Sequence, residues 1–358
     1  MKKRRNTSRR ILFFLLCVIF IGKVQFIAKA EGMDFDVRVF PPENQRRQDA
    51  PGFDLLMAPG SEQVVEIELG NTSSEPITLI IAIATATTDN GGTVLFRPQE
   101  GHIHDNTLLY AMEDITGIES STVVLEGDER IRIPVTIKMP DTAFDGVLAG
   151  GISIMQYVDI DEAMTAGTGM IINRFWMEIP ILLRQTEEVV WPDLSLLEVH
   201  ASQRNWRNIF AVRLQNPEAM FINDMEVFAY VNRAGEMEAL FEQHMEQMQV
   251  APNSNFTLAI PLSGERFVPG YYDFQMEVIA KNGNWSFRQR FYVSAGEAEA
   301  FNATDVSIQR TPLWIFIAAG GVLVFVIFLA YIVIFRRKSR KTTDIAVEEL
   351  VRQMHKCT

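Results

Sequence analysis

The chain has 358 residues, of which 47% are hydrophobic, and a formal net charge of −12 at pH 7. Residues 1–30 and 311–358 hold 15 of the 33 Lys and Arg residues but only 3 of the 45 Asp and Glu residues. The interval 31–310 therefore has 18 basic and 42 acidic residues, a net charge of −24. An excess of that sign repels polyanions and argues against nucleic acid as a partner. A basic protein or a wall polymer bound through hydrogen bonds fits better, and an acidic surface that only aids solubility is the alternative.

Disulfide bonds play no part in the central region of the chain. Cys17 and Cys357 lie near the two ends, and the interval 31–310 has no cysteine. Small exported domains often depend on disulfides. Here buried apolar area must stabilise the fold, and 280 residues are enough for two ordinary cores.

Residues 1–30 are predicted to be a secretory signal peptide. Six basic residues precede an apolar stretch from Ile11 to Gly22, and Ala28-Lys29-Ala30 has the small-x-small pattern of a cleavage site. Cleavage after Ala30 would begin the mature chain at Glu31. An uncleaved N-terminal membrane anchor is the alternative.

The interval 31–295 shows the period-two alternation of half-buried strands. Val65, Ile67 and Leu69 alternate with glutamates, and the pattern recurs at 130–139 and 285–293. We predict an all-β region of two tandem immunoglobulin-like β-sandwiches, at 31–190 and 191–295, joined near Trp191-Pro192-Asp193. The polar stretch 159–169 is the rival boundary, and a short helix is predicted around 161–164.

The run FDGVLAGGISI, residues 144–154, places three glycines where a strand normally carries side chains. Apolar residues would fall on both faces of this strand, which predicts a central strand covered on both sides. The glycines then mark a close approach of another backbone. Two interpretations stay open. One is tight packing, and the other is a groove floor where a glycan or a partner strand contacts Phe144, Asp145, Gly146, Gly150 and Gly151.

The sequence carries no catalytic signature. Ser153 lacks the second glycine of a nucleophile elbow. His102, His104 and Asp105 suggest a metal site but are too few for a complete ligand set. We therefore predict no catalytic residue, no cofactor and no metal, and keep a wall-modifying enzyme as an alternative.

The second half adds one candidate contact, and a segment without strand character follows it. Asn253 and Ser254 lie in a turn whose side chains can bond their own backbone, and they are candidate partner contacts. Residues 296–312 lack strand alternation and are predicted to be a stalk.

Residues 313–335 are predicted to be one transmembrane helix in contact with lipid. These 23 residues carry no charge, and at about 1.5 Å per residue they reach roughly 34 Å, enough for a hydrocarbon core of about 30 Å. The basic tail 336–358 then lies in the cytoplasm, and the chain would be a single-pass membrane protein with its N-terminal part outside. The predicted anchor residues are Trp314, Tyr331, Arg336, Arg337 and Lys338.

Several stretches together resemble the WxL-interacting proteins of Gram-positive bacteria. They are LLMAPGSEQVVEIELGNTS (55–73), MPDTAFDGVLAGGISI (139–154), PDLSLLEV (192–199), MQVAPNSNF (248–256) and NWSFRQRFYV (284–293). The resemblance implies a first domain with a core at about 34–157 and a boundary at 157–168, nearer the N-terminus than Trp191. It also implies a non-enzymatic surface protein. Its first domain would bind peptidoglycan, and its second would bind WxL-domain surface proteins or host matrix proteins. A surface receptor that signals through another protein is a further alternative.

Overall fold

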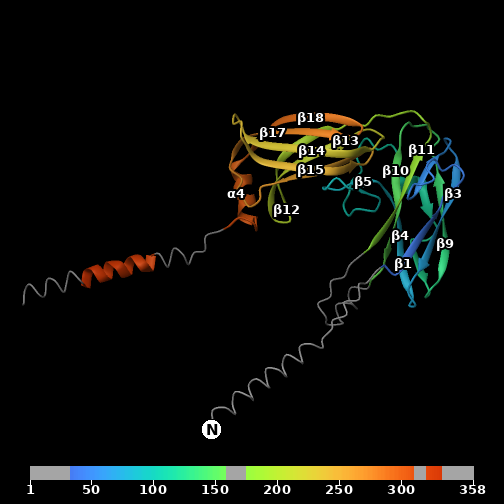
Figure 1. Ribbon diagram of the computed structural model, residues 1–358, viewed down its shortest axis with the longest axis horizontal. Coiled ribbons are helices and arrows are strands. Elements are labelled where there is room, and N and C mark those ends of the chain that lie inside the picture. The colour runs from blue at the N-terminus through green and yellow to red at the C-terminus, as the bar shows by residue number, and fades with distance from the viewer. Residues whose placement is uncertain (1–32, 159–174, 310–319, 333–358) are drawn as a thin grey trace, which may run out of the picture. The chain divides into compact units, whose positions relative to one another are not determined.

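The computed structural model describes residues 33–158, 175–309 and 320–332 (Figure 1). Contacts divide the chain into two compact units. The first comprises Met1–Val199, Ala211–Ala259 and Asp273–Arg290, and the second comprises His200–Phe210, Ile260–Tyr272 and Phe291–Thr358. The predicted signal peptide and the predicted helix at 161–164 lie outside the described residues, as do Trp314, Arg336, Arg337 and Lys338.

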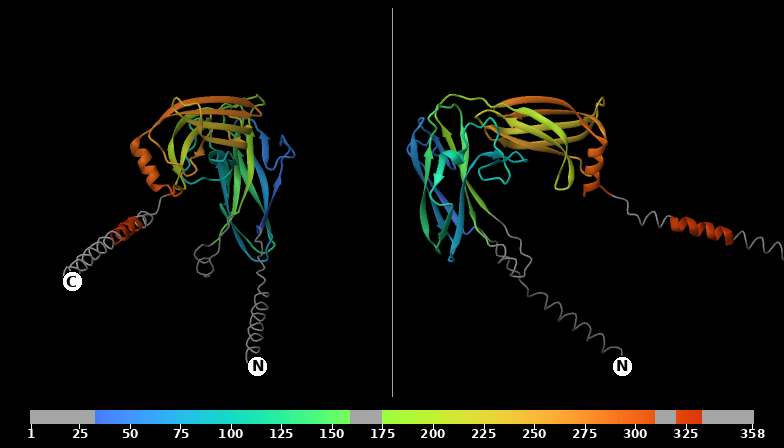
Figure 2. Two further views of the ribbon diagram at one scale, coloured as in Figure 1. Left: turned by 60° about the vertical axis from the view of Figure 1, so that its left-hand side comes forward. Right: turned by 180° about the vertical axis from the view of Figure 1, so that it is seen from behind.

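The N-terminal half forms a sandwich of two sheets (Figure 2). One sheet has the order β1-β3-β9-β7, and its strands are Phe35–Phe40, Glu62–Asn71, Arg130–Lys138 and Thr116–Ile118. The other has the order β2-β11-β10-β4-β8, and its strands are Phe53–Leu56, Trp176–Arg184, Leu148–Gln156, Ile77–Thr85 and Thr122–Leu125. A hairpin of β5 (Thr87–Thr88) and β6 (Val94–Leu95) and a one-turn helix, α2 (Met112–Ile115), complete this half.

Strand alternation in the first sandwich follows the sequence prediction. Val65, Ile67 and Leu69 of β3 are almost fully buried in the core. The opposite face carries ion pairs between strands, such as Arg130 with Asp36 at 2.6 Å and Arg132 with Glu66 at 2.9 Å. Exposed pairs of this kind add little stability, so the buried face determines the register of the strands.

The C-terminal half contains two further antiparallel sheets. One has the order β12-β13-β16, with strands Ser195–Arg204, Arg207–Asn216 and Ser254–Pro261. The other has the order β15-β14-β17-β18, with strands Ala239–Val250, Ile222–Arg233, Gly270–Ala280 and Gly283–Val293. The prediction of an all-β fold is confirmed for the described part of the region 31–295.

The glycine-containing run forms a central strand, as predicted. β10 lies between β11 and β4, and every residue from Leu148 to Ile154 is buried. Leu148, Ile152 and Ile154 belong to the main core of the sandwich. On the other face, Val147 and Ala149 belong to a second apolar cluster with Phe221.

The stalk prediction is wrong over 296–309, because these residues fold onto the second compact unit. α4 (Ala295–Thr304) begins with a capping box, in which Ser294 and Glu297 each bond the other's backbone N–H. Asn302 is 7% exposed and bonds both the N–H and the carbonyl of Phe267. The sequence did not indicate the helix, because the buried polar side chains of Asn302 and Asp305 both bond Asn208, almost 100 residues away.

Residues 320–332, which include Tyr331, are also helical (Figure 1). Among the described residues, no helix has both the length and the apolar character needed to cross a membrane.

Asp305 should stabilise the attachment of α4 in a pH-dependent way. Burial raises the pKa of Asp305, but hydrogen bonds from Ser307, Asn208 and Ile308 outweigh burial and leave the pKa below its ordinary value. We expect Asp305→Asn to lower the free energy of unfolding at pH 7 by about 1–3 kcal/mol. The difference should shrink as the pH falls from about 4 through the lowered pKa, because the native carboxylate then takes up a proton. Urea denaturation of residues 31–309 at pH 7 and pH 3 measures both effects, and an equal difference at the two pH values would contradict this account.

Candidate functional site

A cavity of about 710 Å³ lies in the first compact unit, beside the outer face of β11. Its apolar lining includes Phe53, Phe96, Leu182, Met220 and Phe221, and its charged lining consists of Arg46, Arg47, Asp54, Arg184 and Glu187. We call this cavity the arginine pocket. Three guanidinium groups against two carboxylates make it locally cationic in a region whose overall charge is strongly negative.

The loop before β2 holds two of the arginines in place. Gln45 is 7% exposed, and its side chain bonds the carbonyls of Arg47 and Gly52 and accepts a hydrogen bond from the N–H of Asp54. The backbone of Arg46 bonds the carbonyl of Asp54 at 2.8 Å. The loop is therefore ordered by its own buried amide before any ligand arrives.

The base of the pocket contains a buried ion pair. Arg184 of β11 donates to Asp54 of β2, and the two side chains are 16% and 5% exposed. Burial lowers the pKa of Arg184 below its ordinary value; Asp54 opposes that shift, while Arg46 and Arg47 add to it. Asp54 thus compensates Arg184, which leaves Arg46 and Arg47 at the rim.

The rim arginines are the groups available to a ligand. Both side chains are exposed; Arg47 lies 3.6 Å from Asp49, and Arg46 forms no ion pair within the described part of the chain. An exposed guanidinium can bind a carboxylate or phosphate through two hydrogen bonds. An apolar floor beneath such groups suits a ligand that has both a flat apolar face and an anionic group.

One wall of the pocket is fixed by Glu178 of β11. Its carboxylate accepts from the N–H of Phe96 at 2.6 Å and pairs with Arg97 at 2.8 Å. Phe96 is thereby held over Gly151, where an added Cβ would lie 2.7 Å from the Phe96 side chain. The chain itself covers this glycine.

The other predicted contact glycines are covered as well. A Cβ at Gly150 would meet Met112 of α2 at 2.5 Å, and one at Gly146 would meet the Ala219 carbonyl at 2.4 Å. Gly146 also has a φ of +86°, a conformation that favours glycine. Close packing therefore accounts for all three glycines, and they offer a ligand little surface.

Phe144 and Asp145 are held at the start of this run. Phe144 is half-buried, with its N–H bonded to Gln185, and Asp145 is exposed and accepts from Thr186 at 2.6 Å. A ligand contact at these two residues stays a prediction.

Asn253 and Ser254 contact the first sandwich, all within the first compact unit. Asn253 donates to the carbonyls of Thr107 and Pro217, and Ser254 lies 3.1 Å from the Thr88 hydroxyl. Ser254 is 4% exposed. The turn that the sequence predicted is present, but its side chains bond distant segments as well as neighbours.

His102, His104 and Asp105 do not converge on one point. His104 pairs with Glu113 at 2.8 Å, whereas Asp105 accepts from Gln215 and Asn255.

The arginine pocket was not predicted from the sequence. The sequence does show three basic residues, Arg46, Arg47 and Arg184, in an acidic region. Nothing in the sequence indicates that Arg184 lies beside the other two.

Models of one protein family match both halves of the chain. A model described as the WxL Interacting Protein, peptidoglycan binding domain, matches residues 35–156, and one described as the host binding domain matches 167–303. No curated protein matches the chain. The host-binding match includes β11, although β11 is hydrogen-bonded to β10 and β2 of the first sandwich.

Solved structures show only a distant similarity. The YadV chaperone is 10% identical, and the alignment covers 72% of this chain and all of that one, with a TM-score of 0.29. The CsuC–CsuE chaperone–tip adhesion complex from Acinetobacter baumannii is 13% identical over 63% of this chain and 90% of that one, with a TM-score of 0.30. The PapD-like domain of human CEP192 is 12% identical over 46% and 97%, with a TM-score of 0.27. Similarities this low carry no argument about function.

The pair of Arg184 and Asp54 should be structural. We expect Asp54→Asn to lower the free energy of unfolding by about 3–5 kcal/mol, because it leaves a buried guanidinium without its counter-charge. The double variant Asp54→Leu, Arg184→Met should recover most of that loss, since both charges are then gone. Urea denaturation of the three proteins measures the difference, and a double variant as unstable as Asp54→Asn would argue against this role.

Proposed function

The chain belongs to the WxL-interacting protein family, and from this premise we propose that it is a membrane-anchored, non-catalytic adaptor at the cell surface. Its first domain binds peptidoglycan, and its second binds WxL-domain surface proteins or host matrix proteins. The observation that carries the proposal is the ordered pair of family matches, at 35–156 and 167–303. Both models describe binding domains, which favours an adaptor over a wall-modifying enzyme.

The arginine pocket, which residues of both family matches line within the first compact unit, supports peptidoglycan as a ligand. Peptidoglycan joins sugar rings to short peptides that carry carboxylates. Arg46 and Arg47 suit those carboxylates. The partly exposed side chains of Phe96 and Leu182 in the pocket lining suit an apolar face of the sugar or peptide. We place the ligand here rather than on the buried glycines of β10.

The strand order supports a protein partner for the second domain. β15 and β18 are the two edge strands of their sheet, with 12 and 11 residues, and β15 already uses one edge N–H, which Gln249 donates to the carbonyl of Gly92 at 2.7 Å. An edge strand of that length can pair with an extended segment of another protein through backbone hydrogen bonds. This mode of binding suits either class of partner.

The residues at the tip of the β12–β13 hairpin support the proposal that the chain is anchored in a membrane. Trp206 is 66% exposed with a φ of 58°, and its carbonyl accepts from the N–H of Val306 at 2.9 Å. The chain reaches the apolar segment 313–335 only a few residues after Val306. Trp206, Arg204 and Arg207 together are side chains of the kind that favour the lipid–water interface.

Peptidoglycan retention tests the proposed pocket. We expect residues 31–309 to sediment with insoluble peptidoglycan, and the variant Arg46→Ala, Arg47→Ala to lose at least about a hundredfold in affinity, since two charge-assisted contacts of roughly 1.5–3 kcal/mol each disappear. The matched control is Arg204→Ala, Arg207→Ala, which removes the same charge from two exposed arginines outside the pocket. Sedimentation measures bound protein in each case.

The outcomes distinguish the parts of this proposal. An equal loss of affinity in both double variants would indicate a general charge effect and would show that the pocket is not the binding site. No sedimentation of the unaltered protein would remove the peptidoglycan function. Soluble sugar or peptide fragments released during incubation would show that the protein is an enzyme.

A further inference from the structure

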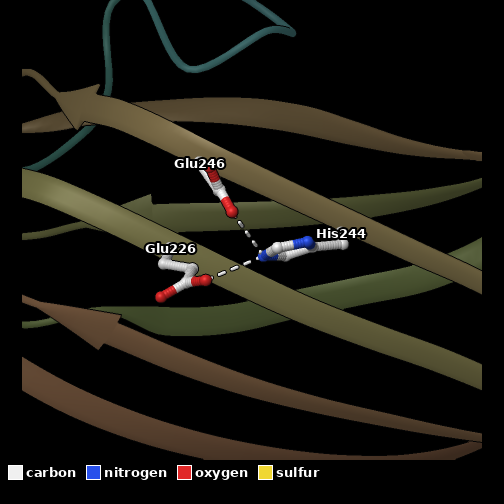
Figure 3. A group of neighbouring side chains, drawn as sticks. All are labelled: Glu226, His244 and Glu246. Atoms are coloured by element: carbon white, nitrogen blue, oxygen red, sulfur yellow. Dashed lines mark hydrogen bonds and ion pairs between the residues drawn. The ribbon is translucent and has the colours of Figure 1, made fainter.

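Three potential metal ligands converge on the exposed face of β14 and β15 (Figure 3). They are Glu226, His244 and Glu246, and we call them the His244 cluster. Their ligand atoms all lie within 4.8 Å of one another. From this geometry we propose that the cluster binds a zinc-class divalent cation.

The strand pairing explains why the three side chains meet. Phe228 lies directly opposite His244 in the antiparallel ladder, and Glu226 and Glu246 are each two residues from that pair, on the same face. The register shifts between Met225 and Val227, and Gln247 has a φ of 58°. Such a bulge re-aims side chains and is common beside functional sites.

The imidazole ring of His244 is held in one orientation. It stacks on Phe228 with the ring centroids 4.4 Å apart and the planes 11° from parallel. Its Nε2 atom lies 2.8 Å from Glu226 Oε1 and 3.4 Å from Glu246 Oε1, as Figure 3 shows. The same nitrogen therefore faces both carboxylates.

A cation satisfies this arrangement better than a proton does. One N–H can donate well to only one of the two carboxylates, and the two negative groups repel each other. A zinc ion about 2.0–2.2 Å from each ligand would place neighbouring ligand atoms roughly 3.3 Å apart. The contact of 3.4 Å already has this length, and the contact of 2.8 Å needs to open by only about half an ångström.

The donor set selects the class of metal. One imidazole nitrogen and two carboxylate oxygens suit zinc and its neighbours, whereas calcium and magnesium prefer oxygen ligands alone. Three protein ligands leave a fourth position open to water. The side chains are 37–63% exposed, so the ion would exchange readily with solvent.

Zinc titration of the full-length chain, first stripped with a chelator, tests the site by calorimetry. We expect saturable binding of one ion per chain, and at least about a tenfold loss of affinity in His244→Gln and in the double variant Glu226→Gln, Glu246→Gln. His200→Gln, which removes an exposed histidine outside the cluster, should bind as the unaltered chain does. These side chains lie on the surface, so the variants should fold, and equal unfolding midpoints without zinc check this.

Two results would overturn the assignment. One is no saturable zinc binding by the unaltered chain, and the other is unchanged affinity in His244→Gln. Neither result bears on peptidoglycan retention, because the His244 cluster shares no residue with the arginine pocket.

Discussion

The pairing of β11 with β10 and β2 is the interaction on which the first compact unit depends. β11 joins β10 in antiparallel and β2 in parallel register, and its inward side chains Ile179, Ile181 and Leu183 are buried in the core. Its outward side chains build the pocket, since Glu178 positions Phe96 and Arg184 pairs with Asp54. The same backbone hydrogen bonds therefore hold the core on one side and the candidate site on the other.

Because β11 pairs with β10 and β2, the boundary between the two family matches differs from the boundary between the sheets. The host-binding match begins at 167, yet β11 at 176–184 completes the sheet of the preceding domain. Without β11, Gly150 to Ile154 would lose a neighbouring strand, and buried backbone groups would lack partners. Residues 35–156 alone thus lack a strand that their own core requires, and contacts such as Ser254 with Thr88 join the two family regions further.

Local pattern predicted the strands well and the sites poorly. Alternation at β3, β9 and β18 depends only on neighbours in sequence, and the glycine run correctly indicated a strand covered on both faces. The function of those glycines depends on Met112, Phe96 and Ala219, which no local pattern connects to them. The arginine pocket joins residue 46 to residue 184, and the His244 cluster depends on a bulge whose position follows from the strand register. The helix α4 was missed because tertiary contacts at Asn302 and Asp305 support a segment with no apolar stripe.

Charge explains how a cationic pocket can function on a strongly acidic surface. At physiological ionic strength the field of a surface charge decays over about 8 Å, so distant carboxylates act weakly at the pocket. Within that range Arg46 is the guanidinium that forms no ion pair among the described residues, because Arg184 pairs with Asp54 and Arg47 lies 3.6 Å from Asp49. The net charge of −24 over 31–310 opposes the long-range approach of an anionic polymer, whereas the arginines favour it at contact. Under the proposed function, binding would then depend on ligand already present at high local concentration, a condition that a protein anchored beside a cell wall would meet.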